Sequence, residues 1–182
     1  IAVLINKGSA SASEIFAGAM QEAEGYPLIG EKTFGKGTVQ QPVSMGDGST
    51  IKLTFYKWLT PNGTWIHKKG IAPTMSVHQD SYYTLQPLVV TEDLRKDMNN
   101  KQVKTLQQML EGLGYAPGRT DGYFSSKTEK AVLAFQRMHK LPVTGSVDQD
   151  VAAKLQQAVV DKIKDEKNDR QLQTGLSWLA QQ

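Results

Sequence analysis

Hydrophobic and polar positions in the first third of the chain follow a pattern typical of a mixed α/β domain. An apolar run at residues 1–5 predicts a buried strand, and apolar residues at helical spacing from Ile15 to Ala23 predict a helix. Shorter apolar or alternating stretches predict further strands at residues 28–30, 39–43, 51–56 and 74–77. We therefore predict an α/β (α+β) core with a mixed sheet and helices.

A different pattern follows residue 97, where three apolar stripes at helical spacing are separated by glycine-containing turns. The stripes fall within residues 103–113, 131–138 and 147–155 and predict a three-helix bundle. Such a bundle, of about 60 residues, is small but able to fold. Residues 80–97 contain Pro87 and lack a clean period, so we predict a connector there.

The last 22 residues change pattern once more. Residues 161–170 carry four acidic and four basic side chains, which predict a solvated helix face. Leu172, Leu176 and Leu179 then form a closing amphipathic stripe.

A run of alternating serine and alanine, residues 8–14, lies at the predicted turn from the first strand to the first helix. Exposed N–H groups and the positive end of the helix dipole favour developing negative charge there. Ser11 in this run is a candidate nucleophile, and Lys36, flanked by two glycines, is a candidate base. Taken alone, Ser11 is better explained as a helix cap and Lys36 as a surface lysine.

Together, the first strand, residues 8–14, the helix and residues 30–40 resemble the active-site half of the carboxyl-terminal processing peptidases, the tail-specific serine proteases. The resemblance implies that Ser11 is the nucleophile, Lys36 the general base and Gln40 the residue that orients the lysine. Gln40 alone fits a strand-surface glutamine equally well. The backbone N–H of Ala12 is our candidate for one oxyanion donor.

In this family the second oxyanion donor comes from an upstream glycine. The chain opens directly on an apolar strand, so we expect that strand to have neighbours upstream and half of the fold to lie outside these residues. With an incomplete oxyanion hole, we expect the chain by itself to hydrolyse substrates poorly.

A lysine can accept the proton of a serine only while its amine is neutral. Model lysine titrates near 10.4 and a useful base near about 7 to 8, so the site must disfavour the ammonium by roughly 4 kcal/mol. Burial is the usual cause, and we expect Phe34 and the core strands to supply part of it. Gly35 and Gly37 permit a tight backbone path around the lysine.

The helical segment resembles the three-helix peptidoglycan-binding domain of cell-wall enzymes. The resemblance rests on a set of motifs, Leu-Gln-Gln-Met-Leu at 106–110, Asp-Gly-Tyr-Phe at 121–124 and Val-Thr-Gly at 143–145. It implies that this module holds cell-wall glycan or peptide in a shallow groove. Tyr115, Arg119 and Tyr123 are either groove residues or turn packing.

The two resemblances predict a discontinuous organisation. Residues 1–79 and 161–182 form the peptidase core, residues 80–97 the connector and residues 98–160 an inserted peptidoglycan-binding-like domain, since residues 169–179 resemble the closing helix of the peptidases. The resemblance implies a serine endopeptidase that cleaves proteins near their C-termini and is tethered to peptidoglycan in an exported, extracytoplasmic bacterial location. The alternative is a non-enzymatic wall-binding or scaffolding module. Peptidoglycan hydrolysis is a third and less favoured hypothesis, because no metal-ligand cluster or paired catalytic carboxylates are evident.

The composition limits the kinds of chemistry and the binding partners that we expect for this chain. The 182 residues include no cysteine, which excludes thiol catalysis and disulfides, and the three histidines lack metal-ligand spacing, so we expect no cofactor or metal. The net charge of +3 is spread without a basic run, which gives no case for nucleic acid. Residues 35–38, Gly-Lys-Gly-Thr, lack the spacing of a phosphate-binding loop. We expect any signal peptide or membrane anchor upstream of these residues, and a homo-oligomer is compatible with the sequence.

Overall fold

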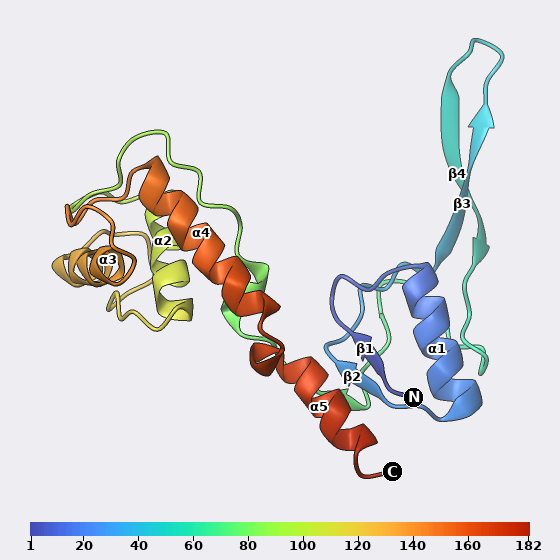
Figure 1. Ribbon diagram of the computed structural model, residues 1–182. Coiled ribbons are helices and arrows are strands. Elements are labelled where there is room, and N and C mark those ends of the chain that lie inside the picture. The colour runs from blue at the N-terminus through green and yellow to red at the C-terminus, as the bar shows by residue number, and fades with distance from the viewer. The chain divides into compact units, whose positions relative to one another are not determined.

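The computed structural model describes residues 1–182 and separates into two compact units (Figure 1). The sheet unit consists of residues 1–78 and 170–182, and the helical unit of residues 79–169. The sheet unit is therefore built from two stretches of sequence with the helical unit inserted between them. No helix combines the length and the apolar character needed to cross a lipid bilayer.

A small parallel sheet forms the centre of the sheet unit. Strands β1 (Val3–Ile5), β2 (Leu28–Gly30) and β5 (Met75–Ser76) lie side by side in the order β1-β2-β5, and helices α1 (Ala12–Glu24) and α5 (Arg170–Leu179) contact β1. The core is made by a few apolar side chains, Ile5, Ala17, Leu28, Ile66 and Ile71. The loops that follow β1 and β2 lead into the residues 8–14 and 31–37 that the sequence singles out.

An antiparallel hairpin follows the second of these loops. Strand β3 (Thr38–Ser44) pairs with β4 (Thr50–Lys57), and a β-bulge lies between Val39 and Gln40. Figure 1 shows the hairpin extending away from α1 and the parallel sheet. Its large apolar side chains remain exposed, among them Val43, Ile51, Leu53 and Phe55. Parallel and antiparallel strands thus lie in two separate sheets.

Helix α5 closes the sheet unit through one buried amide. The Gln171 side-chain nitrogen donates to Ile5 O at 2.7 Å and to Ile29 O at 2.5 Å. Gly30 makes this approach possible, because a Cβ at its position would lie 1.9 Å from that nitrogen. The residues after the helical unit therefore complete the bonding of β1 and β2.

The helical unit packs three α-helices between two short 3₁₀ turns. The turns are η1 (Ser81–Thr84) and η2 (Glu166–Asn168), and the helices are α2 (Lys101–Gly112), α3 (Ser126–Met138) and α4 (Gln149–Lys164). The predicted fold class, an α/β core with helices plus a small helical domain, is confirmed. The expected mixed sheet is not observed, because the antiparallel hairpin does not pair with the parallel strands.

Each α-helix of this unit begins with a side-chain cap. Asn100, Ser125 and Asp148 each accept a hydrogen bond from the backbone N–H three residues further on. The core beneath them is extensive and includes the fully buried side chains Val103, Leu106, Leu110, Phe124, Val132, Phe135 and Val147. The helical unit thus has its own hydrophobic core and its own helix-capping residues.

The boundaries of the helical unit differ from those expected at residues 80, 98 and 160. Residues 80–97, expected as a connector, contribute Tyr82, Leu88, Val90 and Leu94 to its core. At the other end α4 continues to Lys164, and the Lys162 ammonium donates to Gly112 O at 2.7 Å. Irregular spacing hid these contacts, because periodicity detects a helix or strand but not an extended segment packed on one.

Candidate active site

Ser11 lies in the turn between β1 and α1, directly before the first helical residue. Its backbone has φ 56° and ψ −114°, a conformation that residues other than glycine rarely adopt. Strain of this kind costs about 1–3 kcal/mol and is concentrated at functional sites. A sharp, strained strand-to-helix turn is also how α/β hydrolases present a serine nucleophile.

The Glu14 carboxylate joins the Ser11 turn to the loop that carries Lys36. Its Oε2 accepts the Ser11 N–H at 3.0 Å and the Lys36 N–H at 2.8 Å. Its Oε1 accepts the Thr33 hydroxyl at 2.5 Å and the Gly35 N–H at 2.6 Å. One oxygen atom therefore lies within hydrogen-bond distance of the backbones of both predicted catalytic residues.

These bonds keep Glu14 charged inside the protein. Burial raises the pKa of its carboxyl, but hydrogen bonds from Thr33, Lys36, Gly35 and Ser11 outweigh burial and lower the pKa below its ordinary 4.5. The sequence alone did not identify Glu14 as a link between the two loops. A usable signal was present, because Ser-x-x-Glu is the spacing of a capping box.

The two glycines around Lys36 press against the chain segment 66–70. The Lys68 N–H donates to Gly35 O at 2.8 Å. A Cβ on Gly35 would lie 2.8 Å from Gly70 N, and one on Gly37 would lie 2.5 Å from His67 N. These close approaches explain why glycine stands on both sides of the lysine.

The expected burial of Lys36 is not observed within these residues. Lys36 is exposed, and Phe34, expected to shield it, is 66% exposed. The expectation for Phe34 is therefore wrong for this chain: the backbone of Gly35 approaches Gly70 closely, but the Phe34 ring stays at the surface. Gln40 is exposed on β3, where its amide donates to Thr54 Oγ1 at 3.3 Å.

Ala12 is the first residue of α1 and is exposed. An N–H at this position has no acceptor within the helix, so it remains available to an outside acceptor. Ala12 follows the strained Ser11 directly, which places this donor beside the candidate nucleophile. The geometry is compatible with the predicted oxyanion role.

In the helical unit the three residues expected at a ligand groove fall into two groups. Tyr115 packs edge-on against Phe135, with the ring centroids 5.5 Å apart, as a part of the core. Arg119 instead lies over the Tyr123 ring at 5.0 Å and forms an ion pair with Asp121. Tyr115 thus packs partly against the core, and Arg119 and Tyr123 share one surface.

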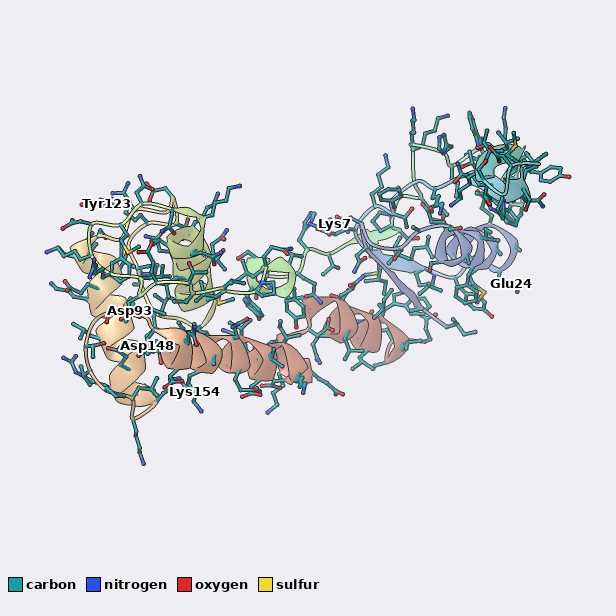
Figure 2. All side chains as sticks on the ribbon, turned by 90° about the horizontal axis from the view of Figure 1, so that it is seen from above. Lys7, Glu24, Asp93, Tyr123, Asp148 and Lys154 are labelled. Atoms are coloured by element: carbon teal, nitrogen blue, oxygen red, sulfur yellow. The ribbon has the colours of Figure 1, made fainter.

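Charged groups surround this second surface. The hydrogen bonds from Arg119 and from the Tyr123 N–H lower the pKa of Asp121 to about 2. The Tyr123 hydroxyl donates to Asp97 at 2.7 Å, which raises the pKa of the tyrosine. An open pocket of about 580 Å³ lies beside them, lined by Gly118, Arg119, Asp121, Ser125, Ser126 and Lys127. Figure 2 shows Tyr123 at the periphery of this unit.

A second open pocket of about 340 Å³ is acidic. It lies at the start of α4, where Asp93 and Asp148 both line it, together with Glu92 and Asp150 (Figure 2). The structure contains no group of His, Cys, Asp or Glu side chains arranged to hold a metal ion.

Comparison with known families assigns both units. The model of "Peptidase family S41" matches residues 1–77, and that of the "Putative peptidoglycan binding domain" matches residues 99–155. The chain contains an S41 peptidase region and a peptidoglycan-binding domain. S41 enzymes are serine peptidases, and the predicted family resemblance is thereby confirmed. The peptidoglycan-binding domain also indicates an association with the cell envelope.

Curated relatives align with both regions of the chain at once. The chain is 58% identical to the carboxy-terminal processing protease CtpB of Bacillus subtilis over 97% of this chain and 37% of the relative. It is 40% identical to CtpA of the same organism over 99% of this chain and 38% of the relative. The chain therefore spans less than two fifths of the length of these proteases. A solved photosystem II D1 C-terminal processing protease is 42% identical over 42% of this chain and 20% of that one, with a TM-score of 0.41.

Proposed function

We propose that the S41 region carries the serine–lysine site of an endopeptidase that processes proteins near their C-termini. The observation that carries this proposal is the Glu14 Oε2 atom, which accepts hydrogen bonds from the Ser11 N–H and the Lys36 N–H together. The strained Ser11 backbone supports the same assignment. The substrate class follows the names of the relatives, which are carboxy-terminal processing proteases.

In the proposed reaction the neutral Lys36 amine removes the Ser11 hydroxyl proton as Oγ attacks the scissile carbonyl carbon. The Ala12 N–H donates to the resulting oxyanion. The Lys36 ammonium then gives its proton to the departing amine, and an acyl-enzyme forms on Ser11. Lys36 then removes a proton from water, the resulting hydroxide attacks the ester carbonyl, and the Lys36 ammonium returns the proton to Ser11 Oγ as the acid product leaves. Gln40 orients the lysine amine through its side-chain oxygen.

Lys36 needs shielding from water for this role, and residues 1–182 leave it exposed. We propose that bound substrate, or further chain of the kind that the longer relatives contain, covers the amine and adds a second oxyanion donor. The chain by itself would then be a poor catalyst. Turnover by residues 1–182 equal to that of the full-length protein would contradict this.

The test uses a fluorophosphonate probe and a peptide substrate on the full-length protein. We expect Ser11→Ala to abolish labelling and Lys36→Ala to slow labelling at least 100-fold, because a serine without its base is a weak nucleophile. Lys32→Ala is the matched control, since Lys32 is exposed in the same loop. Unchanged labelling in Lys36→Ala would refute the serine–lysine assignment. Comparing cleavage of a peptide that has a free C-terminal carboxylate with cleavage of the same peptide with an amidated C-terminus tests the processing role, and we expect the free carboxylate to be preferred.

A second proposed function is tethering of the protein to the cell wall by the helical unit, which the family match over residues 99–155 supports. The Arg119–Tyr123 surface and its pocket are the proposed contact site. We expect residues 79–169 to sediment with purified peptidoglycan and the double variant Arg119→Ala, Tyr123→Ala to bind less, with Lys154→Ala as an exposed control. Wall binding with no Ser11 labelling in the full-length protein would favour the non-enzymatic scaffold. Export from the cytoplasm is part of this proposal.

A further inference from the structure

Two donors converge on the carbonyl oxygen of Gly37, the residue after Lys36. The Trp58 backbone N–H donates at 3.0 Å, and the Trp65 indole Nε1–H donates at 2.9 Å. Any residue other than proline would supply the first donor at position 58. The second comes from a side chain, and therefore depends on tryptophan at position 65.

The Trp65 ring is itself held in place by two neighbours. It stacks on the His67 imidazole with 5.3 Å between the ring centroids and an angle of 23° between the planes. The Lys57 ammonium lies 4.4 Å from the indole centroid, within the range of a cation–π interaction. Lys57 is the cross-strand partner of Thr38, the first residue of β3, so this contact links the ring to the hairpin.

These contacts act on the short stretch between the two side chains assigned to catalysis. Gly37 directly follows Lys36, and β3 begins at Thr38 and carries Gln40. On the other side of the lysine, Gly35 O is already fixed by the Lys68 N–H at 2.8 Å. The indole bond on Gly37 therefore fixes the second end of the backbone around Lys36.

We propose that Trp65 is a positioning residue for the Lys36 amine. Its indole N–H holds the Gly37 carbonyl and so sets the direction in which Lys36 leaves the loop and its spacing from Gln40. A displacement of about 1 Å in such a group can cost up to 10²-fold in rate. The inference rests on the proposed function, because Lys36 must be the base for its direction to matter.

The experiment uses the full-length protein and the variant Trp65→Phe, which removes the N–H donor but keeps an aromatic ring. Trp58→Phe is the matched control, because Trp58 bonds Gly37 through its backbone and keeps that bond. For Trp65→Phe we expect kcat to fall about five- to tenfold, KM to stay within twofold, and the acid limb of the pH–rate profile to move. For Trp58→Phe we expect an unmoved acid limb and kcat within twofold.

The possible results distinguish the positioning role of Trp65 from a purely structural role, and distinguish a failure of this inference from a failure of the proposed function. A wild-type kcat and pH profile in Trp65→Phe, together with an inactive Lys36→Ala, overturns the inference alone. Equal losses of kcat in Trp65→Phe and Trp58→Phe also overturn it. So does a loss of kcat in Trp65→Phe that accompanies a lowered unfolding midpoint while the acid limb does not move. Full turnover in Lys36→Ala removes the proposed function and this inference with it.

Discussion

Both units tie loops together with buried polar side chains, but a carboxylate joins the loops of Ser11 and Lys36, whereas amides join the turns of the helical unit. Glu14 accepts bonds from three backbone N–H groups and one hydroxyl. Gln107 donates to Tyr123 O at 2.8 Å and accepts the Gly122 N–H at 3.0 Å. Gln136 does the same with Ser146 O at 2.8 Å and the Gly145 N–H at 3.0 Å.

The difference follows from the backbone hydrogen-bonding groups that each loop directs toward the buried side chain. The turns of the helical unit present both N–H and C=O groups, which one amide can satisfy without charge. The loops of Ser11 and Lys36 present only donors to Glu14, and a carboxylate is the side chain that accepts at both oxygens. The proposed catalytic loops thus depend on a buried negative charge, while the helical unit needs none.

Glu14→Gln should produce the largest effect. An amide at this position turns an NH₂ group toward backbone N–H donors, so we expect the sheet unit to lose about 3 kcal/mol of unfolding free energy. Ser11 labelling should fall with it, and denaturant unfolding of the full-length protein measures the loss. Glu24→Gln, at the exposed end of the same helix, is the control and should change stability by less than about 0.5 kcal/mol (Figure 2). A stable Glu14→Gln variant would contradict the role of the charge.

Gln107→Leu should follow, with a smaller effect confined to the helical unit. Leucine fills the space but leaves the Gly122 N–H and the Tyr123 carbonyl without their partner, which costs about 2 kcal/mol. Thermal unfolding of residues 79–169 measures this loss. The exposed Gln157→Ala serves as control, and Ser11 labelling of the full-length Gln107→Leu protein should stay at the wild-type rate. Reduced labelling would show that the two units are coupled.

The two units should also lose stability in different pH ranges. The pKa of Glu14 is lowered in the folded state, so its contribution is present above about 4.5 and is lost as pH falls through the folded pKa. Burial and then Lys154 lower the pKa of His139, so its contribution declines from about pH 6.5 downward. Unfolding followed between pH 7 and pH 3 should show the helical unit responding first. The opposite order would contradict these shifts.

The smallest expected effect is at the surface of the helical unit. Arg119→Gln removes the partner that holds the pKa of Asp121 at about 2, so that pKa should rise toward 3.8. Both side chains are exposed, and we expect no measurable change in unfolding midpoint. Carboxyl chemical shifts followed by NMR during an acid titration report the pKa. An unchanged value would show that Arg119 and Asp121 are not paired in solution.

Periodicity and short motifs predicted much of this arrangement. The strand–serine–helix order around Ser11, the glycines beside Lys36 and the three helices after residue 97 all depend on neighbours close in sequence. Glu14 was missed as a bridge because its partner Gly35 lies 21 residues away. Local patterns cannot report such pairs, since only the folded chain brings them together.

The degree of exposure was also beyond local reasoning. Phe34 and the apolar side chains of β3 and β4 look like core residues in sequence, yet they are exposed here. The irregular residues 80–97 look like a connector, yet Leu88 and Leu94 are among the buried side chains of the helical unit. Burial depends on which surfaces meet, and a pattern in one segment does not identify its partner.

The amide of Gln171 also sets an order for biosynthesis. It is made 142 residues after Ile29, whose carbonyl it binds, and the whole helical unit leaves the ribosome before it. Domains fold as units while the chain emerges, and contacts between distant residues form late. The helical unit can therefore be assembled while the sheet unit still lacks the amide that joins β1 and β2, so the proposed Ser11–Lys36 site is completed after the domain inserted into it.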